Sequence, residues 1–164
     1  MESDSDQTVE ACVFCAIARG EEEATVILQD DDFVCFWDIS PAAPHHYLVV
    51  PRQHIVNCLS LHTRHIKMVE RMADMGRAAL HSQGIVDMDN TRLGFHVPPY
   101  TSVDHLHLHV LAPASEISLN YAYKFIPRSD FFITEDSLRT RLEKILPPCF
   151  CSSLDCLLQR RWRH

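Results

Sequence analysis

Residues 105–109 read His105-Leu106-His107-Leu108-His109, with Val103 two residues before them and Val110 and Leu111 directly after. Side chains of a β-strand alternate between its two faces, so a strand over 104–111 would carry three histidines on one face and leucines on the other. Each buried imidazole needs a hydrogen-bond partner, which makes such a row unusual as plain core packing. The pattern indicates a functional strand. It leaves two kinds of site open: a metal site, or a nucleophilic imidazole directed at phosphorus or an acyl carbon.

The rest of the chain predicts an α+β fold. A short helix opens at Cys12 and ends near Gly20, a residue type that favours the left-handed backbone of a helix end. A 3.6-residue apolar period predicts one long helix over 60–82, and Thr134 precedes a third, C-terminal helix. The expected strands, rich in β-branched and aromatic residues or alternating in polarity, are 25–29, 33–39 (after a turn at 30–32), 45–51, 91–97, 104–111 and 131–134.

Composition and charge narrow the class of protein. The chain has 164 residues, enough for one domain with a real core. Its net charge of −7 argues against broad nucleic-acid binding, which depends on basic surface. No apolar run is long enough to span a membrane, and the acidic start lacks the features of a signal peptide. We therefore expect a cytoplasmic protein, with the nucleus as a second compartment, and no membrane partner.

The seven cysteines are scattered and odd in number, which favours thiols or metal ligands over a disulfide framework. We expect a disordered leader over 1–9, one domain over 10–146 and a disordered tail over 147–164. The tail contains three cysteines and a basic end but no periodicity.

Two further stretches point to a known family. The stretch 38–55 reads DISPAAPHHYLVVPRQHI, and it precedes a long helix and then the histidine strand. This order and spacing resemble the histidine triad nucleotide hydrolases over residues 10 to 145. The stretch 92–102, RLGFHVPPYTS, is most similar to the third branch of the histidine triad nucleotide-binding proteins and more distantly to the aprataxin branch.

The resemblance implies an antiparallel sheet with the long central helix packed across it. It also implies a homodimer or larger homo-oligomer, joined through the helix and a strand, and the methionine-rich face of the helix favours this. The implied substrates are purine nucleoside monophosphate conjugates. The implied reaction is hydrolysis of AMP-amine phosphoramidates and aminoacyl-adenylates such as lysyl-AMP, with no cofactor required for catalysis.

By the same resemblance, His107 is the nucleophile that forms a covalent adenylyl-histidine intermediate. A neutral imidazole suits this role because it is not repelled by phosphate oxygens and titrates near neutrality. We expect a backbone carbonyl of the neighbouring strand to hold its other nitrogen. The remaining implied roles are phosphate contact for His109, support from His46, proton relay to the leaving group by Ser102, and nucleoside or substrate binding by Phe36, Asp38, Ile39 and His105.

A second set of residues suits a structural metal. Cys12 and Cys15 have the spacing of two zinc ligands. A single Cys-x-x-Cys motif without a second one is a weak signal. Relatives with this pair complete a zinc site with the histidine after the Val-Val-Pro strand and the first triad histidine, which are His54 and His105 here. The alternative is that the two cysteines are buried core thiols.

Three other functions stay open at this point. A zinc hydrolase would use the three strand histidines as ligands, although no water-activating carboxylate follows at helical spacing. A DNA end-processing enzyme like aprataxin would need a DNA-binding extension that the sequence does not show. A non-catalytic nucleotide-binding regulator would have the same pocket as a slow enzyme.

Overall fold

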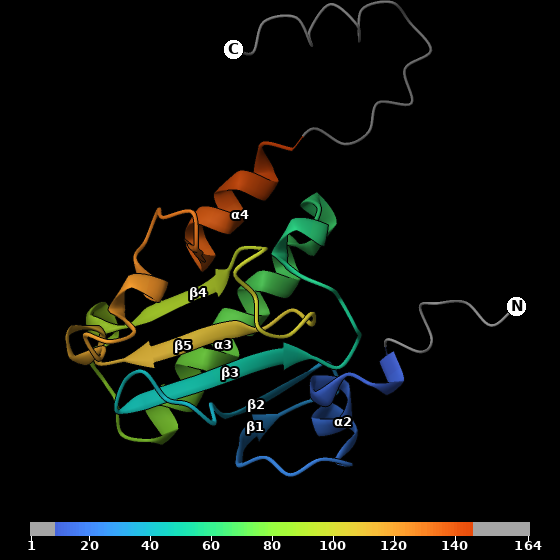
Figure 1. The fold of residues 1–164 in the computed structure, drawn as a ribbon, viewed down its shortest axis with the longest axis horizontal. Coiled ribbons are helices and arrows are strands. Elements are labelled where there is room, and N and C mark those ends of the chain that lie inside the picture. Colours follow the sequence, from blue (N-terminus) through green and yellow to red (C-terminus); the bar gives the residue numbers. More distant parts are fainter. Residues whose placement is uncertain (1–8, 146–164) are drawn as a thin grey trace, which may run out of the picture.

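The computed structural model describes residues 9–145, so the predicted leader, except its last residue, and the predicted tail lie outside the described part. The domain is an antiparallel six-stranded sheet in the order β1-β2-β3-β5-β4-β6, with helices on both faces (Figure 1). The elements are α2 (Val13–Arg19), β1 (Val26–Gln29), β2 (Phe33–Trp37), β3 (His45–Pro51), α3 (Ile66–Ser82), β4 (Arg92–His96), β5 (Leu108–Ala112), β6 (Phe132–Thr134) and α4 (Glu135–Glu143). The α+β prediction is confirmed.

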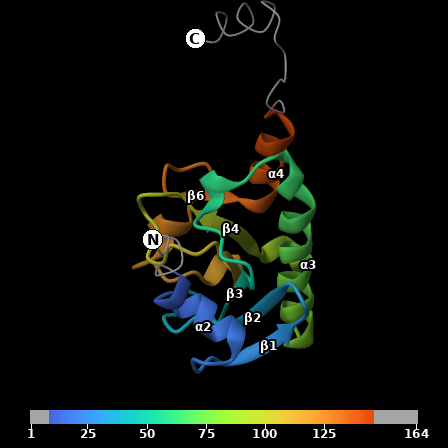
Figure 2. The same ribbon diagram turned by 90° about the vertical axis from the view of Figure 1, so that its right-hand side faces the viewer.

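The sheet lies between α3 on one side and α2 on the other (Figure 2). Each side of the sheet carries an apolar cluster. On one face, α3 packs across the strands and α4 lies beside it, and together they cover the main core. On the other face, α2 covers a smaller cluster formed by Phe14, Phe36, Leu48 and their neighbours. Alternation along the central strand explains this division, since Leu106 and Leu108 join the main core while the histidines face the α2 side.

Local sequence signals fix several of the boundaries. Gly20 ends α2 with φ 75°, the left-handed conformation that glycine adopts without steric cost. The Asp30 side chain accepts hydrogen bonds from the amides of Asp32 and Phe33 at 2.8 and 2.7 Å, which closes the predicted β1–β2 turn.

The long helix starts later than predicted. Residues 58–60 and 63–65 form two 3₁₀ turns, and α3 begins only at Ile66. Side chains compete for the backbone there: Asn57 accepts from the Leu59 amide, and His65 Nδ1 accepts from the His62 amide, both at 2.9 Å. These local bonds hold the chain in turns where the apolar period suggested helix.

The histidine strand is also shorter than predicted. β5 begins at Leu108, which pairs with Val49, so His105 and His107 lie in an extended segment ahead of the sheet ladder. Pro51 explains this limit. Its carbonyl accepts a hydrogen bond from the His105 side chain at 2.8 Å, and the Leu106 amide donates instead to the Ile55 carbonyl.

The short strand β6 extends the sheet beyond β4 and forms its far edge. β6 pairs with β4 from Gly94 to His96, and α4 then packs against α3. A Cβ at Gly94 would run into the Ile133 carbonyl and the Phe132 ring, so only glycine allows this close approach. The methionines of α3 that we expected at an oligomer interface are packed within the chain: Met72 is buried, and Met68 and Met75 contact the main core. Among residues 9–145, no helix combines the length and apolar composition of a membrane span.

Candidate active site

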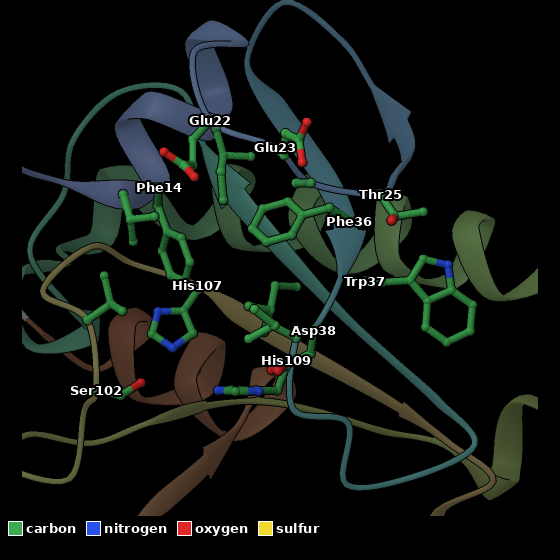
Figure 3. Close-up of a pocket in the computed structure, with 16 residues that line it drawn as sticks. Phe14, Glu22, Glu23, Thr25, Phe36, Trp37, Asp38, Ser102, His107 and His109 are labelled. Atoms are coloured by element: carbon green, nitrogen blue, oxygen red, sulfur yellow. The ribbon is translucent and has the colours of Figure 1, made fainter.

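A cavity of about 800 Å³ opens on the α2 side of the sheet, in front of the histidines (Figure 3). Its walls come from α2, from the loop that precedes β1, from β2 and the residues after it, and from residues 102–109. The predicted site residues that line it are Phe36, Asp38, Ile39, Ser102, His107 and His109. His46 lies behind His109, and His105 faces away toward the cysteines.

His107 is held with one ring nitrogen available to the cavity. Its Nδ1 lies 2.7 Å from the His105 carbonyl oxygen, which can only accept, so Nδ1 carries the proton and Nε2 keeps its lone pair. Burial lowers the pKa of His107, so the ring is neutral at pH 7, while the carbonyl bond and Asp38 oppose this shift. The acceptor was expected on the neighbouring strand. It lies instead two residues earlier in the same segment, because that segment has left the ladder.

A chain of hydrogen bonds fixes the tautomers of the other two histidines. The Ala42 amide donates to His46 Nδ1 at 2.9 Å, so the His46 proton must reside on Nε2. His46 Nε2 lies 2.9 Å from His109 Nδ1, and therefore donates to it. His109 must then carry its own proton on Nε2. The Ala42 amide thus determines which ring nitrogen carries the proton in both His46 and His109.

His109 Nε2–H is the unsatisfied donor of the site. This atom is buried and has no hydrogen-bond partner among the described residues, although its ring lines the cavity. Burial, followed by the neighbouring histidines, keeps the pKa of His109 well below its usual range, so the ring is a neutral donor. A buried N–H without a partner costs free energy unless a ligand atom accepts it. An anionic oxygen in the cavity would satisfy it.

The residues predicted to bind the nucleoside or to serve the leaving group differ in how far they enter the cavity. Phe36 is buried against Phe14, with ring centroids 5.7 Å apart. Asp38 accepts from the Ser40 amide at 2.7 Å and lies 3.4 Å from His46 Nε2, and burial raises the pKa of this carboxyl. Ile39 is 97% exposed and stands at the rim, and Ser102 is also exposed.

Sequence reasoning missed two parts of the wall. α2 contributes Val13, Phe14 and Ile17, and the loop before β1 contributes Glu22 and Glu23. The one-face spacing of Val13 and Ile17 could have indicated the first part. No local pattern marks the two glutamates, because only the packing of α2 brings their loop to the cavity.

His96 is a further histidine close to the site. Its ring centroid is 4.4 Å from that of His109, and its Nε2 bonds to the Lys124 carbonyl at 3.0 Å. A ring nitrogen of His96 lies within 4.8 Å of nitrogens of His107 and His109. This trio does not suit a metal, since His109 Nε2 already carries a proton. The three strand histidines do not converge either, because His105 belongs to another cluster, and the zinc-hydrolase alternative loses its ligand set.

Cys12, Cys15, His54 and His105 form that other cluster, with their ligand atoms all within 4.8 Å of one another. His105 Nδ1 lies 3.3 and 3.4 Å from the two sulfurs, and His54 Nδ1 lies 3.3 Å from Cys15 Sγ. His105 Nε2–H donates a hydrogen bond to the Pro51 carbonyl, so Nε2 carries the proton and Nδ1 presents a lone pair to the sulfurs. Burial raises the pKa of Cys15 to about 11. Two sulfurs and two imidazoles are a donor set that fits zinc.

Comparison with known proteins agrees with this architecture. The family model described as scavenger mRNA decapping enzyme C-term binding matches residues 11–123. A histidine triad protein from Clostridium difficile superposes with a TM-score of 0.57 at 29% identity, covering 68% of this chain and 92% of that one. The chain belongs to this family, and with it to the histidine triad superfamily.

Particular relatives are closer in sequence. Adenosine 5'-monophosphoramidase HINT3 of Danio rerio is 52% identical over 126 residues, which are 76% of this chain and 78% of that protein. The Mus musculus protein of the same name is 45% identical, covering 81% of this chain and 82% of that protein. A Zn-bound histidine triad family protein from Mycobacterium smegmatis covers 82% of this chain and 95% of its own at 25% identity, with a TM-score of 0.52.

The buried histidines predict acid sensitivity. Burial is the main cause that lowers the pKa values of His46 and His96 to about 4, against 6.5 in the unfolded chain. Between pH 6.5 and 4 the unfolded chain therefore binds protons that the folded chain does not, and the free energy of unfolding falls as the pH falls. Denaturant unfolding across this range measures the effect. In His96→Phe, the free energy of unfolding should fall over this pH range by roughly 1–2 kcal/mol less than in the wild type, a value that allows for partial solvation of the His96 ring.

His81→Phe, at an exposed position on α3, is the matched control and should keep the full pH dependence. If the free energy of unfolding depends on pH equally in the His96 and His81 variants, the buried His96 ring is not a cause of the acid sensitivity.

Proposed function

We propose that the protein hydrolyses the P–N bond of AMP-amine phosphoramidates, and also aminoacyl-adenylates such as lysyl-AMP, through a covalent adenylyl-His107 intermediate. One observation carries the proposal. The cavity presents a nitrogen lone pair, on His107, next to an unpartnered N–H donor, on His109. A nucleophile beside a donor for oxygen is the arrangement that substitution at phosphorus needs.

The geometry supports a two-step course. In the first step, His107 Nε2 attacks phosphorus and the P–N bond breaks, while His109 Nε2–H donates to a phosphate oxygen. The leaving amine takes a proton from the Ser102 hydroxyl, which lines the same cavity and, being exposed, recovers a proton from solvent water. The modified imidazole is cationic, and the His105 carbonyl and the Asp38 carboxylate stabilise that charge. In the second step, water attacks phosphorus and releases one proton to solvent, the P–Nε2 bond breaks, and the nucleoside monophosphate leaves while His107 returns to its neutral form.

The charges of the cavity favour a substrate with one phosphate. None of the sixteen described residues that line it is Lys or Arg, while Glu22, Glu23 and Asp38 are acidic. Two neutral imidazoles cannot balance the several negative charges of a polyphosphate. An amine leaving group adds no negative charge, so phosphoramidates suit this cavity. The HINT3 relatives bear the name adenosine 5'-monophosphoramidase, in agreement with this choice.

Replacing the nucleophile tests the proposal. In His107→Ala, kcat/KM toward AMP-lysine should fall by roughly 10³-fold or more, because loss of a covalent nucleophile removes most of the rate. Mass spectrometry of the quenched wild-type reaction should detect adenylyl-protein on the peptide that contains His107, and the variant should lack it.

His81→Ala, at an exposed histidine remote from the cavity, should keep both activity and adduct. A well-folded His107→Ala protein that retains more than a few per cent of activity would overturn the mechanism. Nucleotide binding without turnover by the wild type would indicate a regulatory binding protein.

We also propose that Cys12, Cys15, His54 and His105 hold a structural zinc ion. The ion would tie α2 to the segment that precedes β5. It would neutralise the buried thiolates and take no part in bond breaking, since His107 and His109 lie outside its ligand set. The Mycobacterium smegmatis relative is described as Zn-bound, which supports the proposal.

Metal analysis distinguishes zinc from core thiols. Protein purified under reducing conditions should carry about one zinc per chain, and Cys12→Ser with Cys15→Ser should lose it together with part of the free energy of unfolding. Cys58→Ser also removes a buried thiol, but should keep the ion. Metal-free wild-type protein whose stability does not respond to added zinc or to chelators would identify the pair as core thiols.

We further propose a homo-oligomer whose smallest form is a dimer, assembled through the apolar segment 117–126 between β5 and β6. Four large side chains are exposed there: Leu119 (93%), Tyr121 (42%), Tyr123 (53%) and Ile126 (51%). Exposed apolar patches of this kind are typical of protein interfaces. The surfaces first expected are less suitable, because β6 occupies the β4 edge and α4 lies beside α3.

Light scattering at micromolar concentration should give at least twice the 18.8 kDa of one chain. Leu119→Asp with Tyr123→Asp should lower the mass to that of a monomer, because a carboxylate is costly to bury at an interface. Val86→Asp, at another exposed apolar residue, should leave the mass unchanged. A monomeric wild type would contradict assembly.

A further inference from the structure

The imidazole of His96 stands beside the nucleophile, on the side of the sheet where the nucleoside wall does not reach. His96 ends β4, which flanks β5 on the side away from β3 and β2 (Figure 1). Its ring centroid is 4.4 Å from that of His109. One of its ring nitrogens lies within 4.8 Å of nitrogens of both His107 and His109. A single oxygen atom fits between nitrogens at this spacing.

The fold holds the His96 ring with one nitrogen free. Nε2 donates to the Lys124 carbonyl at 3.0 Å, so Nδ1 keeps a lone pair. Phe125 and Phe132 pack against the ring, with centroids 5.1 and 5.7 Å from its own. Nδ1 has no hydrogen-bond partner among residues 9–145 and is not one of their buried unpartnered atoms, so solvent reaches it. Burial lowers the pKa of His96 to about 4, and the ring is neutral at pH 7.

A second, smaller hollow gives water a place beside the two rings. Its volume is about 10 Å³, and His96 and His107 both line it, together with Asn57 and Thr101. A hollow of this size holds one water molecule when polar groups surround it. Water can therefore wait next to the nucleophile on the β4 side.

The free lone pair of His96 suits a group that must lose a proton. An anionic phosphate oxygen has no proton to give, and the leaving amine must gain one. The water of the second step must lose one. At that stage His107 Nε2 is bonded to phosphorus, and His109 Nδ1 already accepts from His46. Among these imidazoles, His96 Nδ1 is then the free acceptor.

The direction of attack agrees with this choice. Attacking and leaving groups at phosphorus lie roughly in line, so water enters on the side that the amine has vacated. Ser102, which serves the amine, belongs to the segment 97–104 that begins directly after His96. Both residues therefore approach the leaving-group side from one stretch of chain.

We propose that His96 is the general base of the second step, an inference that rests on the proposed function. Water forms the new P–O bond while the P–Nε2 bond breaks and its electron pair returns to His107. One proton of the water moves to His96 Nδ1 and from there to solvent. The negative charge of the bound phosphate favours this transfer, because it stabilises the protonated ring. The Lys124 carbonyl, which accepts from Nε2–H, stabilises it as well.

Rapid-quench kinetics with AMP-lysine separates the two steps, since lysine release reports the first and AMP release reports the second. In His96→Phe, lysine release in the first turnover should keep the wild-type rate. AMP release should slow by about 100-fold or more, the usual contribution of a general base. Mass spectrometry should then find adenylyl-His107 on nearly every chain. His96→Gln keeps a polar side chain but cannot take up a proton, and should accumulate the adduct in the same way.

His81→Phe, at an exposed position on α3, is the matched control and should release lysine and AMP as the wild type does. Equal slowing of both steps in the two His96 variants, or wild-type rates in both, overturns the role of His96 while the phosphoramidase stands. Wild-type protein that shows neither turnover nor adduct overturns the proposed function itself.

Discussion

The extended segment 105–109 contributes to both the core and the site, because its side chains point alternately to the two faces of the sheet. Leu106 and Leu108 are buried against α3, and the histidines between them face α2 and the cavity. Moving the register by one residue would exchange the two sets, placing imidazoles in the apolar core and leucines at the site. Packing on one side therefore fixes the position of the chemistry on the other.

Backbone groups then decide what each imidazole can do. The His105 carbonyl accepts from His107 Nδ1–H and so leaves a lone pair on His107 Nε2. The Pro51 carbonyl accepts from His105 Nε2–H, and the lone pair of His105 Nδ1 then faces the cysteines. The Ala42 amide donates to His46, which in turn donates to His109. Neighbouring histidines of one pentapeptide thus present three different groups: a lone pair to the cavity from His107, a lone pair to the cysteines from His105, and an N–H donor from His109. Burial keeps their rings neutral, so these assignments hold at neutral pH.

The absence of Lys and Arg from the described cavity wall gives the site its particular character. A strongly basic cavity would attract many phosphorylated ligands, whereas this one relies on directed donors and acceptors. His109 offers an N–H donor to the cavity, and the carboxylates of Asp38, Glu22 and Glu23 offer acceptors. Selection then depends on hydrogen-bond direction more than on total charge.

The sequence by itself determined the α+β class and the strand and helix order, because alternation, helical period, prolines and glycines are local signals. The family resemblance added six of the sixteen described residues around the cavity. The sequence could not place the start of α3 or β5, since side-chain bonds at Asn57, His65 and Pro51 decide those boundaries. Only the tertiary structure separated His105 from His107 and His109, and brought Phe14, Glu22 and Glu23 to the cavity. These outcomes depend on contacts between segments distant in sequence, for which no local pattern exists.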